Sequence, residues 1–313
     1  MNLAGVVVNP TKLADPDGFM AAVEGCLRQQ GWREPLWLET TADDPGRGQA
    51  MEAAAAGADL VLACGGDGTV TACAEGLADS GVPLGIIPLG TGNLLARNLG
   101  LPAGVKEALL VALTGCDLPT DVGLVNGARF VVMAGLGLDA RMLADASEPL
   151  KHRIGCAAYA VSVLRHLGDR PMRVRVSVDG GAAVAMRASA VIIGNVGWLR
   201  GGLPLLPDAR PDDGKLDAVI LTARGWATWA ALAAHVLTRR GRPDGLRRTQ
   251  FRRLQVDLDR DHRWERDGEL MGTTQRLIVE AQPGGLLLRL PAPDPACTDE
   301  VDREVSPPES AGG

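Results

Sequence analysis

Short apolar runs alternate with stretches of helical spacing through roughly the first 120 residues. The runs of strand length cover residues 3–8, 35–40, 60–63 and 84–88. Helical spacing covers residues 17–30, where Phe19, Met20, Val23 and Leu27 recur, and the Ala-rich residues 49–58. Strands that are apolar throughout are buried on both faces. The pattern therefore predicts a three-layer α/β domain with a mostly parallel sheet.

The pattern changes after Asp121, where several runs alternate with period two, as in residues 173–178. The strand-like runs are 130–134, 172–178, 188–194, 216–222, 254–258, 276–281 and 286–290, and the helical stretches are 154–167 and 226–238. This pattern predicts a β-sandwich-like second domain with helical insertions. We predict an α/β domain over 1–122, a β-rich domain over 123–290 whose last strand can return to the first, and a disordered acidic tail over 291–313.

Polar and Gly-rich residues follow the predicted strands of the first domain. Gly65-Gly66-Asp67-Gly68-Thr69 follows one strand, Gly90-Thr91-Gly92-Asn93 follows another, and Asn9 and Thr40 follow two more. The carboxyl ends of parallel strands are where ligands bind in such sheets. A strand leading into a Gly-rich turn and a helix N-terminus forms a phosphate cradle, although a Gly-rich turn alone is a weak signal.

Asp67 changes the interpretation of the first turn. A carboxylate among phosphate-binding amides repels phosphate unless it acts through Mg²⁺ or as a base. The two turns together therefore predict a nucleotide, a metal ion and an acid–base group, which is the equipment for phosphoryl transfer.

Composition limits the kinds of binding partner that we expect for this protein. The chain has 313 residues, of which 46% are apolar and 3% aromatic, so stacking platforms for nucleic acid are not expected. The net charge is −6, and the tail from residue 291, with six acids and one Arg, carries −5 of it. The remaining −1 gives no overall field that would select a partner.

The cysteines and the hydropathy indicate a location. Six Cys without CxxC spacing predict reduced thiols in a cytoplasmic protein without a zinc site, and the four His show no ligand spacing. We expect no signal peptide, because the N-terminus lacks a basic region followed by a long apolar stretch. We expect no membrane span, because no 18-residue apolar run exists. A membrane role would be peripheral, at the inner membrane face. The oligomeric state stays open, a homodimer included.

A distant pair of carboxylates completes a set of motifs. Asn9-Pro10, the two Gly-rich turns and Asp267-Gly268-Glu269, in this order, resemble the diacylglycerol and sphingosine lipid kinase family, in particular its soluble bacterial diacylglycerol kinase-like branch. Residues 151–159 and 207–216 resemble that branch too. The resemblance covers roughly residues 3–290. It implies an α/β nucleotide domain, a β-sandwich domain and an active site between them.

The resemblance and the Gly-rich turns together give the candidate residues for ATP. They are Asn9, Pro10, Thr11, Lys12, Thr40, Gly65, Gly66, Asp67, Gly68, Thr69, Val70, Thr71, Ala72, Gly90, Thr91, Gly92 and Asn93. The candidate catalytic carboxylates are Asp67, Asp267 and Glu269, one of which accepts the proton of the lipid hydroxyl. The resemblance favours Glu269, and the sequence does not choose. Asp-Gly is also a strong hairpin signal, so a plain turn at 267–269 is the competing interpretation.

The resemblance also implies a structural Mg²⁺ in the second domain. Its ligands would be the Asp213 carboxylate and the carbonyls of Arg210 and Lys215, and oxygen ligands suit Mg²⁺. An ordinary turn with solvated acids is equally compatible. Two departures from the family pattern, Leu94 in place of Asp and Thr71 in place of Asn, leave the identity of the lipid open.

Two further segments allow two interpretations each. Residues 226–237 form an apolar stretch, and seven Arg follow between Arg239 and Arg253, among them Arg247 and Arg248. This segment is either a membrane-surface element or a core helix with a solvated basic loop. Residues 198–206 either line an acyl pocket or connect strands.

The sequence therefore predicts an ATP- and Mg²⁺-dependent kinase that phosphorylates a hydroxyl of diacylglycerol or of a related neutral or sphingoid lipid. NAD kinase is the alternative enzyme, since it shares the Gly-Gly-Asp-Gly turn and the two-domain plan. A non-catalytic nucleotide- or lipid-binding regulator is the alternative from another class.

Overall fold

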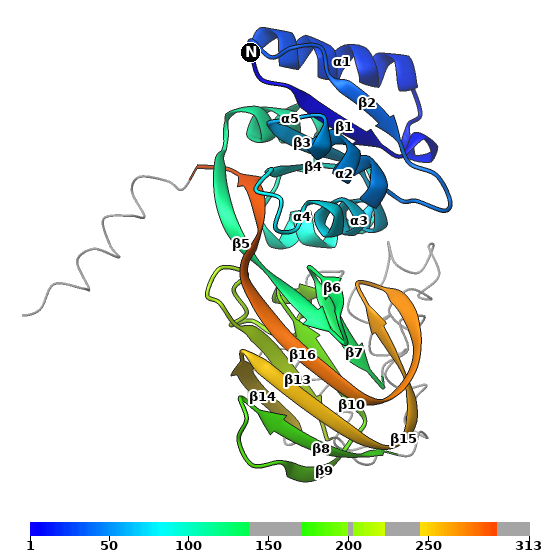
Figure 1. Cartoon of the computed structure of the whole chain (residues 1–313), viewed down its shortest axis with the longest axis vertical. Helices are drawn as coiled ribbons and strands as arrows, with labels where there is room; N and C mark the ends of the chain where they lie inside the picture. The colour runs from blue at the N-terminus through cyan, green and yellow to red at the C-terminus, as the bar shows by residue number, and fades with distance from the viewer. Residues whose placement is uncertain (138–170, 200–202, 223–244, 293–313) are drawn as a thin grey trace, which may run out of the picture.

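Two bodies follow one another along the long axis of the molecule (Figure 1). The computed structural model describes residues 1–137, 171–199, 203–222 and 245–292. Several predicted features lie outside these residues: the helices at 154–167 and 226–238, the motif at 151–159, Arg239 and Arg240, and nearly all of the acidic tail.

The first body is the predicted α/β domain. Its strands are β1 (Ala4–Val8), β2 (Leu36–Glu39), β3 (Leu60–Gly65) and β4 (Leu84–Pro88). Its helices are the 3-10 turn η1 (Pro10–Lys12), α1 (Pro16–Gln29), α2 (Arg47–Ala55), α3 (Asp67–Leu77), α4 (Leu94–Asn98) and α5 (Val105–Thr114). The four strands pair in parallel in the order β4-β3-β1-β2, so the prediction of a parallel sheet is confirmed.

Helices pack on both faces of this sheet because three of its four strands, β1, β3 and β4, are buried along their whole length. All residues of β1 and β3 are buried. On one face, α1 contributes Phe19, Val23 and Leu27, spaced by four residues, and packs beside α5. On the other face, α2 and α3 contribute Ala50, Ala53 and Leu77 to a second core. The sheet and its two helical layers are the three layers that the sequence predicts.

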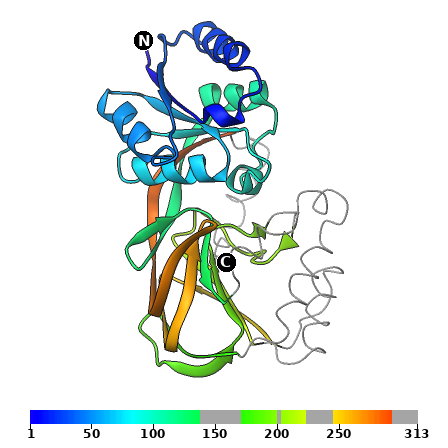
Figure 2. The same ribbon diagram turned by 90° about the vertical axis from the view of Figure 1, so that its right-hand side faces the viewer.

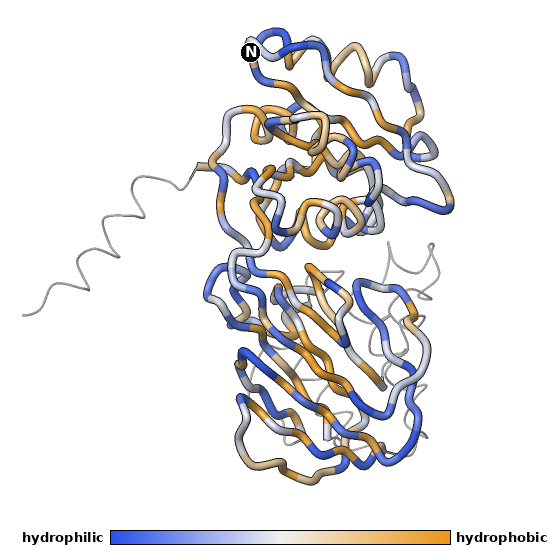
Figure 3. The backbone as a smooth tube through the Cα atoms, viewed as in Figure 1, coloured by the Kyte–Doolittle hydropathy of each residue, from blue (hydrophilic) through white to orange (hydrophobic). Residues whose placement is uncertain are grey.

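The second body is built from strands. They are β6 (Ala128–Phe130), β7 (Met133–Leu136), β8 (Met172–Val178), β9 (Val184–Ala188), β10 (Ala190–Gly194), β11 (Trp198–Leu199), β12 (Leu203–Pro204), β13 (Leu216–Leu221), β14 (Leu246–Phe251) and β15 (Arg253–Arg266). These strands pair antiparallel, with β11 and β12 in a separate two-stranded sheet. The core of this body includes Phe130, Phe251 and Trp264. Apolar and polar residues are mixed along these strands (Figure 3). Buried and exposed residues alternate in the first part of β8, whereas all residues of β10 and β13 are buried. Figure 2, a view turned by 90° from that of Figure 1, shows this β-rich body beneath the helical one.

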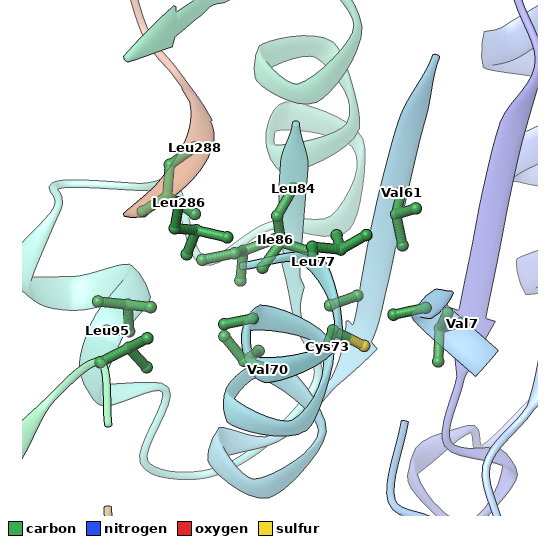
Figure 4. Packing of buried hydrophobic residues seen from close by; sticks show 14 of the residues in the cluster. Val7, Val61, Val70, Cys73, Leu77, Leu84, Ile86, Leu95, Leu286 and Leu288 are labelled. Atoms are coloured by element: carbon green, nitrogen blue, oxygen red, sulfur yellow. The ribbon is translucent and has the colours of Figure 1, made fainter. Parts of the chain in front are cut away.

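A pair of long strands, β5 (Cys116–Val125) and β16 (Glu269–Leu290), joins the two bodies. The prediction of separate strands at 276–281 and 286–290 is wrong, because both are parts of β16, with an irregularity between Gln282 and Leu286. Leu288 pairs in parallel with Leu84 of β4. Leu286 and Leu288 pack in the core of the first body (Figure 4). The boundary between 122 and 123 stays a prediction.

Two other expectations change in detail. The strand predicted at 130–134 is interrupted, since β6 ends at Phe130 and β7 begins at Met133. Arg247 and Arg248 belong to strand β14, which pairs with β13, so this part of the predicted basic loop is regular structure.

Within the described residues, we find no helix with the length and hydropathy that a membrane crossing requires.

Candidate active site

A cleft of about 800 Å³ lies where the two bodies meet. The first body contributes the loop before α2 and one face of α3, and the second contributes the β6–β7 link and the β15–β16 turn. Its lining includes Asp43, Asp44, Arg47, Asp67, Gly68, Thr71, Ala72, Glu75, Leu94, Met133, Glu265, Arg266, Asp267 and Glu269. All three candidate catalytic carboxylates thus line one cleft, although Asp67 and Glu269 lie about two hundred positions apart in the sequence.

Asp67 begins helix α3 instead of lying in the turn that precedes it. Gly66 is the N-cap residue, and Asp67 to Thr69 form the first helical turn. The Asp67 carboxylate accepts a hydrogen bond from the backbone N–H of Leu94, the first residue of α4. An acidic residue in the first turn is favourable because the helix dipole is positive there.

The two Gly-rich turns touch through their backbones. A Cβ added to Gly90 would lie 2.6 Å from the Cα of Gly66, so position 90 requires glycine. Asn93, whose φ is +46°, closes the second turn: its Oδ1 accepts from the N–H of Gly90 at 3.0 Å, and its Nδ2 donates to the Gly90 carbonyl. The two turns are therefore neighbours at this edge of the sheet.

The other candidate residues for the nucleotide lie at the same edge of the sheet. Asn9 follows β1, and its Oδ1 accepts from the N–H and the hydroxyl of Thr11. Thr40 follows β2 and donates its N–H to the Val8 carbonyl at 2.9 Å. Thr69 and Val70 are buried, so their side chains pack inside the body and only backbone groups at these positions could reach a ligand.

The turn from β15 to β16 has the hairpin geometry that Asp-Gly favours. Asp267 and Gly268 have φ values of +44° and +88°, as in a type I′ turn. The Asp267 carboxylate accepts hydrogen bonds from three backbone N–H groups outside the hairpin, those of Val131, Val132 and Met133, each at 2.9 Å. It therefore holds the hairpin against the β6–β7 link.

Two effects on the pKa oppose each other at Asp267. Burial raises the pKa of its carboxyl group, and the three N–H donors and the Arg266 charge lower it; burial dominates and brings the pKa to about 6.

Glu269 is much more exposed than Asp267, since 71% of its side chain is accessible. It forms an ion pair with the Arg266 guanidinium, at 3.6 Å. Glu269 can therefore reach a hydroxyl in the cleft, whereas both oxygens of Asp267 are engaged.

The predicted metal turn is a separate acidic region. Asp213 Oδ1 accepts the N–H of Lys215 at 3.0 Å, and Arg210 pairs with Asp212. Asp121 accepts N–H groups of Gly214 and Gly284. Burial, and then the charges of Asp213 and its neighbours, raise the pKa values of Asp121 and Asp217. One carboxylate with two backbone carbonyls suits Mg²⁺, and a cation there would offset the local negative charge. In the parts of the chain that the structure describes, no three His, Cys, Asp or Glu side chains group around one point.

Six charged residues that line the cleft are not indicated by the sequence motifs: Asp43, Asp44, Arg47, Glu75, Glu265 and Arg266. Glu75 lies eight residues after Asp67 on the same face of α3, and Arg266 directly precedes the Asp-Gly-Glu motif. Helical spacing and adjacency to a motif are the signals that could have pointed to them.

The α/β body, with its two neighbouring Gly-rich turns, faces a β-sandwich-like body across an acidic cleft. This is the architecture of a two-domain kinase. Family comparisons agree. The diacylglycerol kinase catalytic domain matches residues 4–125, and the YegS C-terminal NAD kinase beta sandwich-like domain matches residues 131–289. The chain belongs to the diacylglycerol kinase and YegS-like lipid kinase family, whose members are phosphotransferases with an alcohol group as acceptor.

Similar proteins cover nearly the whole chain. It is 31% identical to the "Diacylglycerol kinase" of Bacillus subtilis (strain 168), over 87% of this chain and 91% of that one. It is 35% identical to a "Probable lipid kinase YegS-like" of Pseudomonas fluorescens, over 88% and 91%.

Solved structures share the fold. A diacylglycerol kinase from Bacillus anthracis str. Sterne superposes with a TM-score of 0.71 at 21% identity, covering 94% of this chain and 97% of that one. Yeast NADH kinase superposes with a TM-score of 0.52 at 11% identity, covering 100% and 90%.

Proposed function

We propose that this protein transfers the γ-phosphate of ATP to a hydroxyl of diacylglycerol or of a related neutral or sphingoid lipid, with Mg²⁺. The observation that carries the proposal is the cleft itself: Asp67, beside the two Gly-rich turns, and Glu269, on the turn of the second body, line the same space. A kinase of this kind needs a phosphate site and a proton acceptor on opposite sides of one substrate.

The roles follow from the contacts. An alcohol is a poor nucleophile, so a carboxylate must accept its proton as the hydroxyl oxygen attacks the γ-phosphorus and the bond to ADP breaks. Glu269 takes this role, because Asp267 is engaged by three N–H groups. The 17 candidate residues from Asn9 to Asn93 that are named above hold the nucleotide, with backbone N–H groups of Gly65, Gly66, Gly90 and Gly92 near the phosphates.

The charge of the cleft favours a nucleotide that carries Mg²⁺. Seven acidic and two basic residues line it, a balance of −5. A free triphosphate would be repelled, whereas a cation between Asp67 and the phosphates would offset part of this charge. Mg²⁺ supplies charge neutralisation when bound there. A second Mg²⁺ would take the Asp213 carboxylate and the carbonyls of Arg210 and Lys215.

The lipid stays the open part of the proposal. In the family pattern Asp stands at the position of Leu94 and Asn at that of Thr71. In this chain Leu94 contributes its N–H, not a carboxylate, to the surroundings of Asp67. The proposal therefore names a lipid hydroxyl, with diacylglycerol first. Contact with a membrane would be peripheral.

The test incubates purified protein with radiolabelled ATP, Mg²⁺ and either a total cell lipid extract in detergent micelles or NAD. We expect a labelled lipid, identified by mass spectrometry, and no labelled NADP. The Glu269→Gln variant should bind ATP and yield at least tenfold less product.

Each alternative has its own result in this assay. Label in NADP with none in lipid would establish NAD kinase activity. ATP binding with no labelled product from either acceptor would make the protein a nucleotide- or lipid-binding regulator.

A further inference from the structure

A largely buried arginine connects the two sides of the cleft. Arg266 immediately precedes the Asp267–Glu269 turn and has 14% of its side chain exposed. Its Nη1 donates to the Glu75 carboxylate of helix α3 and to the Arg129 carbonyl of β6. Its Nε contacts the sulfur of Met271 at 3.3 Å. One guanidinium thus contacts the first body, the β6 strand and the hairpin that carries the carboxylates.

Glu75 connects Arg266 to the cleft-lining face of helix α3. Asp67, Thr71 and Glu75 are spaced by four residues and line the cleft along one face of the helix. Only 17% of the Glu75 side chain is exposed, so its carboxylate is largely withdrawn from water. An ion pair shielded in this way holds its geometry better than an exposed pair, whose contribution is small.

The remaining amino group of Arg266 faces the proposed proton acceptor. Its Nη2 lies 3.6 Å from Glu269 Oε2, and Glu269 is otherwise an exposed residue just after a turn. An exposed glutamate samples several rotamers, and a fixed positive charge beside it favours those that point toward the cleft. Because Glu75 shares the Arg266 charge, the guanidinium does not turn wholly toward Glu269.

We propose that Arg266 is a positioning residue: held by Glu75, it fixes the carboxylate of Glu269 relative to helix α3 and Asp67. This inference rests on the proposed function, because it assigns Glu269 a role in proton transfer. The identity of residue 266 sets turnover through Glu269, beyond any contribution of the ion pair to the joining of the two bodies.

The experiment compares substitutions at both ends of the ion pair. Arg266→Ala, Arg266→Lys and the exchange Glu75→Arg with Arg266→Glu are measured for Tm, KM for ATP and turnover on the lipid extract at saturating ATP. The exchange restores opposite charges across the boundary but puts a negative charge beside Glu269. Arg129→Ala is the matched control: it removes the ion pair of Arg129 with Asp79, which also joins the two bodies, and leaves the Arg129 carbonyl in place.

We expect Arg266→Ala to lower turnover about ten- to a hundredfold with a smaller change in KM for ATP, the scale of loss that follows small misplacements of reacting groups. Arg266→Lys should recover part of the turnover. The exchange should recover most of the lost Tm and little of the turnover. Arg129→Ala should keep turnover within about twofold of the unsubstituted enzyme, in line with an exposed ion pair.

Two results would overturn the inference while leaving the proposed function intact. One is an exchange variant that recovers turnover together with Tm; the other is Arg266→Ala turning over as fast as Arg129→Ala. Absence of labelled lipid from the unsubstituted enzyme would overturn the proposed function itself, and this inference with it.

Discussion

The carboxylate of Asp67 accepts the backbone N–H of Leu94, which joins the first residues of helices α3 and α4. Each helix follows one Gly-rich turn, so this hydrogen bond connects the two turns beside their contact at Gly66 and Gly90. Asp67 therefore has a structural partner in addition to its proposed work at the phosphates. A substitution at this position has to separate the two contributions.

Asp67→Asn makes that separation, because the Asn oxygen can still accept from Leu94 while the charge is lost. We expect a Tm close to that of the unsubstituted protein and a fall in turnover of about a hundredfold or more, the scale of losing one well-placed electrostatic group. Asp67→Ala, which also loses the acceptor, should lower both Tm and turnover. Calorimetry and the lipid-extract assay measure the two effects. Normal turnover in Asp67→Asn would remove Asp67 from the catalytic set.

Gly90→Ala should destabilise the nucleotide edge of the sheet. The added Cβ would lie 2.6 Å from the Gly66 Cα and 2.8 Å from Asn93 Oδ1, and backbone atoms cannot move aside cheaply. We expect a loss of about 1–3 kcal/mol in the free energy of unfolding. Gly25→Ala is the matched control, since Gly25 lies inside α1 with nothing within 4 Å of an added Cβ. It should stabilise by about 0.5–1 kcal/mol. Denaturant unfolding measures both; equal effects of the two substitutions would contradict a tight contact between the turns.

The local parts of the fold could be predicted from the sequence. Apolar strands such as β1 and β3 and the spacing of Phe19, Val23 and Leu27 determine their own burial, so the parallel sheet and its helices follow from pattern. The continuous β16 could not be predicted in this way. Pro283, Gly284 and Gly285 break its apolar pattern, and Gly284 has a φ of +61°. These three residues form the irregularity between Gln282 and Leu286, and β16 pairs with β5 on both sides of it.

The candidate site shows the same division. Each Gly-rich turn, and likewise the Asp-Gly-Glu motif, is a short run of consecutive residues, so it can be recognised in the sequence. Arg266 and Glu75 form an ion pair across 191 positions, and no local spacing connects these two residues with each other. Such a contact follows from how the two bodies are placed, which depends on tertiary packing and not on local propensity.

Asp267 should titrate well above an ordinary aspartate. Burial raises its pKa from 3.8 to about 6 despite its three N–H donors. A carboxyl group whose pKa is raised on folding binds its proton more tightly in the folded state, so its contribution to stability increases as the pH falls through about 6 toward 4. The ¹³C chemical shift of the Asp267 carboxyl carbon, assigned with Asp267→Asn, measures the midpoint directly. A midpoint below 4 would mean that the N–H donors outweigh burial.

Mg²⁺ should stabilise the protein through the turn at 210–215, without nucleotide. Asp121 and Asp217 have raised pKa values because they are buried near Asp213, so a cation bound there relieves repulsion in the folded state. At a Mg²⁺ concentration a hundred times the Kd, binding adds about 2.7 kcal/mol, and each kcal/mol raises Tm by roughly 2–4 °C in a chain of this scale. Asp213→Asn should abolish the rise that MgCl2 produces over EDTA, whereas Asp212→Asn, which removes the neighbouring acid paired with Arg210, should keep most of it. Asp67→Asn, measured in parallel, reports any part that arises in the cleft. Equal Mg²⁺ responses in Asp213→Asn and the unsubstituted protein would show that this turn does not bind the ion.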